Sequence, residues 1–190
     1  MFSKKGFTLI ELLVVSAIIA LLTAVSAAAF NTFSRSQTLT QSAKEVESAL
    51  KDAQNRALSS VDGQNWGVRL VPGSNLLDLF ATPSMGYSDP SARVFDRELP
   101  DTVEIFDAAG SLPPGYNFSV VFVVSSGAVG YANDAGTACI GGSDDVSCSF
   151  PLGRQDCIVI GVRLQGTSQE RYLKVNGRSI FEDDSATSCP

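Results

Sequence analysis

The sequence contains no histidine among its 190 residues. This absence excludes Ser-His-Asp triads, histidine-based zinc sites and most metal-dependent hydrolases. Basic side chains are also scarce: the sequence has 14 Lys and Arg and 20 Asp and Glu, which gives a formal net charge of −6. A chain this acidic lacks the general basic surface that binds nucleic acid. With 44% hydrophobic and 18% charged residues it is not disordered throughout, and its length suits one globular domain.

Charge, proline and glycine are all missing from residues 12–30, which read LLVVSAIIALLTAVSAAAF. A helix of this length spans about 28 Å, close to the thickness of a bilayer core. Lys4 and Lys5 precede the run and predict a cytoplasmic N-terminus. A secretory signal peptide cut near residues 27–29 and a plain signal anchor are the alternatives. Glu11 argues against both, because a lone carboxylate at the start of a membrane helix is costly and by default functional.

The absence of proline and glycine extends over residues 7–62, and the first turn signal is Asp62-Gly63. We therefore predict one helix of about 55 residues. We expect residues 7–30 to form a membrane-spanning segment and residues 31–62 to form an amphipathic segment that packs on a head domain. The predicted packing stripe recurs mostly at three- and four-residue steps and comprises Phe33, Leu39, Ala43, Val46, Leu50, Ala53, Ala57 and Val61.

Residues 63–190 change to the two-residue alternation of strands, which predicts an α+β protein with a long N-terminal helix packed on a β-rich head. The Gly/Ser/Asp-rich segment 133–156 is interpreted as a loop inserted between strands. Strands are expected at 66–71, 76–82, 94–99, 103–106, 116–124, 128–132, 157–164, 171–175 and 179–181.

Four cysteines all lie in the predicted head, on the side of the membrane away from the cytoplasm: Cys139, Cys148, Cys157 and Cys189. An oxidising compartment favours disulfides, so we expect two bridges, with three possible pairings that the sequence leaves open. The nine-residue spacing of the first three favours at least one local bridge, and a bridge to Cys189 would tie down the C-terminal tail. A zinc site of four thiolates is the alternative, but no C-x2-C pair is present.

Catalytic, cofactor and metal sites are not indicated by the sequence. No phosphate-binding loop appears, and no histidine is available to activate a thiol, so we do not expect an enzyme. Two acidic clusters, Asp144-Asp145 and Glu182-Asp183-Asp184, could bind Ca²⁺ weakly. Neither has the regular oxygen-ligand spacing of a calcium loop, which favours a solvated surface.

The N-terminal residues Lys4-Lys5-Gly6-Phe7-Thr8-Leu9-Ile10-Glu11 resemble the class III leader of type IV prepilins and type II secretion pseudopilins. The resemblance implies that a prepilin peptidase removes residues 1–6 by cutting after Gly6, and that the new N-terminal residue Phe7 is N-methylated. It also implies that residues 7–30 become the core of a filament, where Glu11 pairs with the N-terminal amine of the adjacent subunit. Such a buried polar pair can fix the register between helices.

The β-rich region resembles, more loosely, the heads of GspH/FimT-type proteins. Residues 66–70 are similar to their opening hairpin, residues 99–105 to their LP-x-x-V-x-I element, and residues 162–178 to their last hairpin. The resemblance implies a minor pilin. The alternatives are a GspH-like pseudopilin of a type II secretion system, a major pilin and a DNA-uptake pilin. Residues 27–29 lack the helix-bending proline usual in major pilins, which weakens that alternative.

Partners and location follow from the same resemblance. It implies other pilin or pseudopilin subunits, the prepilin peptidase, an inner-membrane assembly platform, and membrane lipid before assembly. The chain would be a single-pass inner-membrane protein with its head on the periplasmic or extracellular side, and later part of a filament. DNA-binding members are thought to use basic residues near the C-terminus, here Arg171, Lys174 and Arg178. The acidic residues at 182–184 would oppose phosphate, so nucleic acid is not an expected partner.

Overall fold

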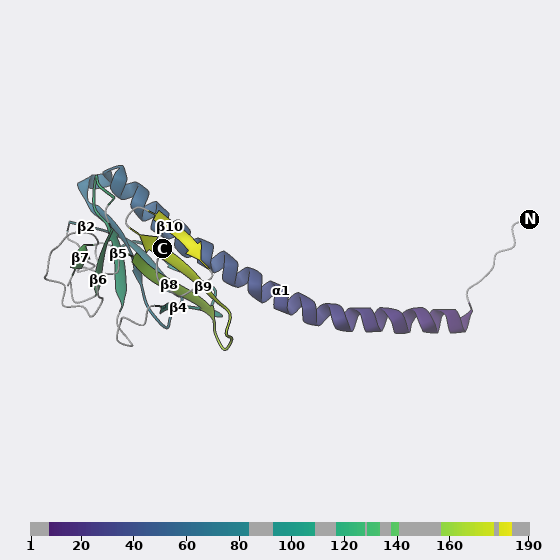
Figure 1. Ribbon diagram of the computed structural model, residues 1–190. Coiled ribbons are helices and arrows are strands. Elements are labelled where there is room, and N and C mark those ends of the chain that lie inside the picture. The colour runs from purple at the N-terminus through teal and green to yellow at the C-terminus, as the bar shows by residue number, and fades with distance from the viewer. Residues whose placement is uncertain are drawn as a thin grey trace, which may run out of the picture. The chain divides into compact units, whose positions relative to one another are not determined.

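The computed structural model describes residues 8–83, 93–108, 117–127, 129–133, 138–140, 157–176 and 179–183 (Figure 1). The chain forms two compact units, Met1–Gln37 and Thr38–Pro190. The described part of the first unit is helical, and the second contains the rest of that helix and every described strand. The predicted α+β class, a long N-terminal helix followed by antiparallel sheets, is confirmed.

Helix α1 comprises Leu9–Leu58 and ends four residues before the predicted end at residue 62. The backbone of Ser60 is left-handed, with φ of 52°, and a short 3₁₀ turn follows at Val61–Gly63. Within that turn Asp62 also has a positive φ, of 56°. A left-handed residue just past the last turn ends a helix because the next N–H groups can no longer reach the helical carbonyls. Our prediction missed this end because serine is a less distinctive stop signal than glycine.

The predicted packing stripe is confirmed for the part of α1 that belongs to the second unit. Its buried side chains recur at three- and four-residue steps and are Leu39, Ser42, Ala43, Val46, Ala49, Leu50, Ala53 and Ala57. Val61 is partly buried against the same core. Phe33 was wrongly placed in this stripe, because it lies in the first unit and its side chain is 61% exposed.

The strands of the second unit form two antiparallel sheets. The first sheet has the order β3 (Arg93–Glu98), β2 (Leu76–Thr82), β1 (Asn65–Leu70), β5 (Phe118–Phe122), β6 (Val129–Asn133) and β7 (Ala138–Ile140). The second sheet has the order β10 (Ser179–Asp183), β9 (Glu170–Asn176), β8 (Cys157–Leu164) and β4 (Val103–Asp107). Ile105 on β4 joins the two sheets, because its N–H donates to the Ser74 carbonyl and its carbonyl accepts from the Gly73 N–H, both at 2.8 Å.

Each predicted strand segment overlaps an observed strand, and the bounds of β2 and β8 agree with the prediction. The interpretation of residues 133–156 as a loop was wrong at two places. Asn133 is the last residue of β6, and Ala138–Ile140 forms β7, which pairs with β6 through Tyr131 and Cys139. A three-residue strand is too short to show alternation, and its pairing partner, not its own pattern, determines it. Residues 141–156 lie outside the described residues.

One hydrophobic core joins α1 to both sheets. In the first sheet it takes alternate residues of β1, Trp66, Val68 and Leu70. The Trp66 indole is anchored at the end of α1, where its Nε1 donates to the Val61 carbonyl at 3.1 Å and the Arg56 guanidinium lies 4.8 Å from the ring centroid. Trp66 is the only tryptophan of the chain, so its fluorescence reports on the packing of the helix against the sheet.

Ser42 lies in the buried stripe of α1, and its hydroxyl has no hydrogen-bond partner. Burying an unpartnered hydroxyl costs roughly 1–3 kcal/mol, and alanine is also a better helix former than serine. We therefore expect Ser42→Ala to stabilise the fold by about 1 kcal/mol, which raises Tm by about 3 °C. Thermal unfolding of the detergent-solubilised chain, followed by Trp66 fluorescence, measures this. Ser48→Ala, at an exposed position of the same helix, is the control and should change Tm by less. A lower Tm for Ser42→Ala would contradict the prediction.

Candidate functional site

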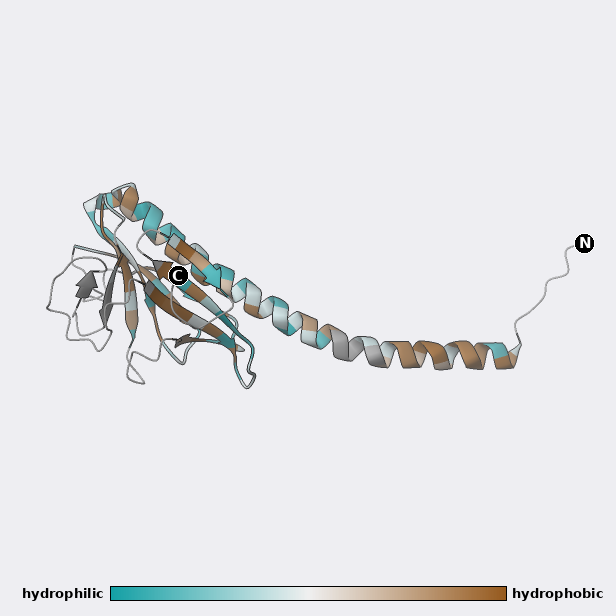
Figure 2. Cartoon of the chain, viewed as in Figure 1, coloured by the Kyte–Doolittle hydropathy of each residue, from teal (hydrophilic) through white to brown (hydrophobic). Residues whose placement is uncertain are grey.

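The helix of the first unit carries many exposed apolar side chains. Figure 2 colours most of the N-terminal part of this helix as hydrophobic. Successive residues of a helix point about 100° apart, so the uninterrupted apolar run 12–15 already surrounds the axis. No charged residue lies between Glu11 and Arg35. An apolar surface of this extent needs a cover of lipid or protein. Its large exposed members are Leu9, Ile10, Leu12, Leu13, Val14, Val15, Ile18, Ile19, Leu21, Leu22, Phe30 and Phe33.

Three hydroxyl side chains interrupt the apolar surface between Glu11 and Phe30, and each hydrogen-bonds to a carbonyl of its own helix. Ser16 Oγ donates to the Leu13 carbonyl at 2.9 Å. Thr23 Oγ1 lies 2.9 Å from the Ile19 carbonyl. Ser26 Oγ donates to the Leu22 carbonyl at 2.8 Å. These hydroxyls need no external partner, so this helix is compatible with surroundings that offer no hydrogen bonds.

Glu11 forms a capping box with Thr8 at the start of α1. The Thr8 N–H donates to Glu11 Oε2 at 3.4 Å, and the Glu11 N–H donates to Thr8 Oγ1 at 3.3 Å. The box satisfies N–H groups that have no helical acceptor, and it places a carboxylate at the positive end of the helix dipole. Our sequence reading assigned no role to Thr8. The Thr-x-x-Glu spacing before an apolar run was the signal that could have identified it.

The predicted cleavage site, Gly6 and Phe7, lies outside the described residues. The predicted membrane span overlaps the apolar helix just described. Among the described residues, no helix meets the combined requirement of length and mean hydropathy for crossing a membrane. The membrane span therefore remains a prediction.

The N-terminal segment matches a known family model. Residues 1–27 match the model described as the prokaryotic N-terminal methylation motif. The chain carries a prepilin-type methylation motif. This motif is consistent with a type IV pilin or pseudopilin, and it includes Gly6, Phe7 and Glu11. No curated protein and no solved structure matches the chain.

The four cysteines lie in the second unit, more than 100 residues along the chain from the methylation motif. Cys139 lies in β7, at the edge of the first sheet, and Cys157 is the first residue of β8 in the second sheet. Cys148 and Cys189 lie outside the described residues. Both the two disulfides and their pairing remain predictions.

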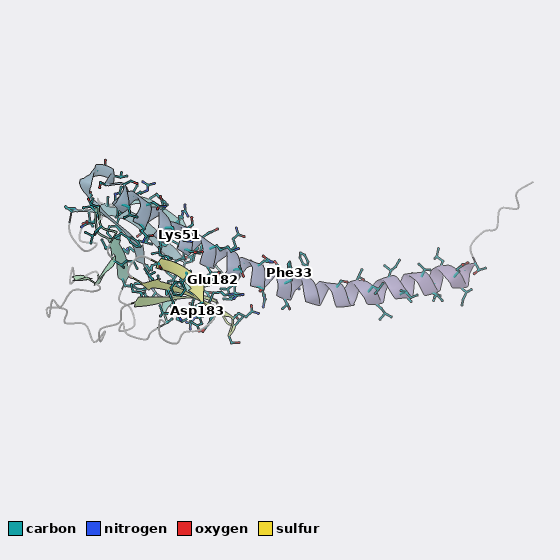
Figure 3. All side chains as sticks on the ribbon, turned by 45° about the horizontal axis from the view of Figure 1, so that its top comes forward. Phe33, Lys51, Glu182 and Asp183 are labelled. Atoms are coloured by element: carbon teal, nitrogen blue, oxygen red, sulfur yellow. The ribbon has the colours of Figure 1, made fainter. Side chains whose placement is uncertain are left out.

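The charged residues near the C-terminus form ion pairs between β9 and β10. Figure 3 labels the two acidic members on β10, Glu182 and Asp183. Lys174 Nζ lies 2.5 Å from Asp183 Oδ2, and the Lys174 side chain is only 2% exposed. Arg171 Nε lies 3.8 Å from Glu182 Oε1. These pairs neutralise two of the three cations that DNA binding would use, and the third, Arg178, lies outside the described residues.

The acidic clusters offer no metal site within the described part of the chain, where no group of three or more His, Cys, Asp or Glu could hold an ion. Glu182 and Asp183 form the ion pairs just described, whereas Asp144, Asp145 and Asp184 fall outside the described residues.

Tyr172 on β9 donates a hydrogen bond from its hydroxyl to Glu170. This bond, together with burial and the charge of Glu170, raises the pKa of Tyr172 above its ordinary value of 10.0. A raised pKa means that the folded state favours the neutral hydroxyl. The stabilisation is therefore fully present below pH 10 and is lost as the pH rises through the folded-state pKa.

Proposed function

We propose that this chain is a structural subunit of a type IV pilin-like filament, a minor pilin with a GspH/FimT-like head. The methylation motif at residues 1–27 is the observation that carries the proposal. The exposed apolar helix supports the proposal, because the motif overlaps the apolar segment that lipid or protein must cover. Before assembly, lipid of the inner membrane covers the helix, and the head lies outside the cytoplasm. In the filament, the helices of neighbouring subunits replace the lipid.

Glu11 sets the register between subunits in this proposal. Cleavage after Gly6 creates an amine on Phe7, and the amine of an adjacent subunit provides the positive charge that Glu11 needs in apolar surroundings. The capping box with Thr8 provides Glu11 with two backbone-linked hydrogen bonds but no neutralising charge. The charge of the carboxylate is therefore still not neutralised after the helix has formed, and a cation from a neighbouring subunit can bind it.

The remaining partners are proteins that process and move the subunit. A prepilin peptidase removes residues 1–6, and a separate assembly platform extracts the subunit from the membrane. The chain itself performs no catalysis in this scheme. The ion pairs of Arg171 and Lys174 with β10 favour a protein-facing or solvated head over one that binds DNA.

Peptide mass spectrometry of filaments sheared from the cell surface tests the proposal. It quantifies this chain against the other subunits and identifies its N-terminal residue. A minor pilin predicts a trace component that starts at methylated Phe7. An abundant chain with this N-terminus would instead indicate a major pilin. Retention of the cleaved chain in the membrane fraction would favour a secretion pseudopilin, and an intact Met1 or a cut near Ala29 would overturn the pilin proposal.

A further inference from the structure

Two exposed side chains of the first unit belong neither to the core nor to the methylation motif. Phe33 is 61% exposed, and Figure 3 shows its ring projecting from α1. Arg35 is also exposed, and among the described residues no side chain forms an ion pair with it. One exposed ring needs no explanation by itself, so the position of both residues along the helix is decisive.

The polarity of α1 changes over the few residues that contain Phe33 and Arg35. Residues 12–30 carry no charge, and Phe30 at the end of this run is 69% exposed. Over residues 31–38 every side chain other than Phe33 is polar or charged. Phe30 and Phe33 therefore mark the end of the surface that needs an apolar cover, and Arg35 marks the start of the surface that can face water.

The distance between the charges at the two ends of this segment matches a lipid bilayer. Arg35 follows Glu11 by 24 residues, which is about 36 Å along a helix. The hydrocarbon core of a bilayer is about 30 Å thick, and the bilayer with its headgroup regions is about 40–45 Å thick. When Glu11 lies in one headgroup region, Arg35 therefore reaches the opposite one. An uncharged segment several residues shorter would leave one of the two charges in the hydrocarbon.

We propose that Phe30, Phe33 and Arg35 form an interfacial anchor that binds anionic phospholipid at the non-cytoplasmic face of the membrane. Aromatic rings at this depth lie at the level of the headgroups and keep contact with the acyl chains. The guanidinium group offers parallel N–H donors to a lipid phosphate. The anchor rests on the membrane location in the proposed function, and it adds the class of lipid and the residues that bind it.

The three side chains of the anchor lie on different sides of α1. Successive residues of a helix turn by about 100°, so Phe30 and Phe33 are about 60° apart, and Arg35 is about 140–160° from either ring. A single docked helix would contact one of these sides, whereas lipid surrounds a membrane helix completely. The arrangement therefore favours the bilayer over a second copy of the chain as the partner of all three side chains.

Depth-dependent fluorescence quenching tests where Phe33 lies. The full chain with Phe33→Trp is reconstituted into vesicles of phosphatidylglycerol and phosphatidylcholine, with the phosphatidylcholine brominated either next to the headgroup or near the chain end. We expect stronger quenching by the shallow bromines than by the deep ones. The unmodified chain, whose one tryptophan is buried in the head, provides the background. Ser48→Trp, at an exposed position further along α1, is the matched control and should show no quenching above this background.

Lipid retention tests the charge of the anchor. Native mass spectrometry of the full chain, released from nanodiscs with equal amounts of phosphatidylglycerol and phosphatidylcholine, gives the ratio of the two lipids that stay bound. Arg35→Gln should lower the share of phosphatidylglycerol relative to phosphatidylcholine by about fivefold, the usual effect of one Arg near an anionic surface. Lys44→Gln removes an exposed cation about two and a half helical turns further along α1 and should leave the ratio unchanged. Lys4 and Lys5 are present in both variants, so their attraction for anionic lipid cancels in the comparison.

The anchor and the proposed function fail in different ways. An unchanged lipid ratio in Arg35→Gln would show that the guanidinium group does not select anionic lipid, and would overturn the anchor. Stronger deep than shallow quenching of Phe33→Trp would place residue 33 in the hydrocarbon and would overturn it too. No quenching, in a chain that floats with the vesicles, would assign Phe33 to water or to a second copy, and the anchor alone would fail. A chain that does not float with the vesicles would overturn both the anchor and the membrane location.

Discussion

Replacing Glu11 with alanine should leave membrane insertion intact and reduce the amount of this chain in filaments by at least about 100-fold. Insertion should persist because the variant removes the only charged residue between the leader and Arg35. Incorporation should fall because the Phe7 amine of the neighbouring subunit would then enter apolar surroundings unpaired. Breaking a buried ion pair by removing one partner costs about 3–5 kcal/mol. Mass spectrometry of the membrane fraction and of sheared filaments measures both quantities in the same cells.

Two further variants separate the charge of Glu11 from its capping role. Glu11→Gln retains an amide oxygen that can accept from the Thr8 N–H, but it loses the charge. Thr8→Ala removes the hydroxyl that accepts from the Glu11 N–H, but it leaves the carboxylate. If the ion pair sets the register, Glu11→Gln resembles Glu11→Ala, and Thr8→Ala retains most of its incorporation. The opposite order would assign the main role of Glu11 to the helix cap.

The most accurate predictions were for elements whose own residues carry the structural signal. The bounds of β2 and β8 agree because each strand is a largely apolar run that turn residues bound in the sequence. The buried stripe of α1 was predicted from Leu39 onward for the same reason. β7 could not be predicted, because three residues form a strand only through hydrogen bonds to β6.

Local hydrogen bonding and backbone strain explain the other differences. The end of α1 depends on the left-handed conformation of Ser60, which a serine in the sequence does not specify. At the candidate site, Glu11 was recognised by its unusual position in an apolar run. Its partner Thr8 becomes apparent only when the first turn of the helix is considered as a set of unpaired N–H groups.

The burial of Lys174 illustrates a third limit of sequence reading. We considered this residue as a cation available to phosphate because the family resemblance places the basic residues of DNA-binding members in this region near the C-terminus. The pattern does not show that the Lys174 ammonium group contacts the Asp183 carboxylate on β10, or that the side chain is almost fully buried. A residue on the outer face of a sheet can therefore be as buried as one in the core, and its availability to a partner depends on its neighbours on the adjacent strands.

Gly67→Ala should be the most destabilising single-methyl addition in the described head, with a loss of about 3 kcal/mol and a Tm about 10 °C lower. A Cβ at this position would lie 2.8 Å from the Val120 carbonyl oxygen and 2.7 Å from a ring carbon of Phe80. The Phe80 ring cannot move away, because it is fully buried against Val121 in a small cluster of its own. The carbonyl cannot move away either, because β1 pairs with β5 through Gly67 and Val121.

Gly161→Ala provides the comparison that tests this argument, with both variants unfolded by heat and followed by Trp66 fluorescence. A Cβ at Gly161 would lie even closer to its neighbour, 2.3 Å from the ring of Phe106. All of its nearest atoms belong to that one side chain, which is only partly buried on the outer face. The Phe106 ring can rotate outward, so this variant should lose about 1 kcal/mol. An equal or larger loss at Gly161 would show that the distance to the nearest atom, and not the freedom of that atom to move, determines the cost.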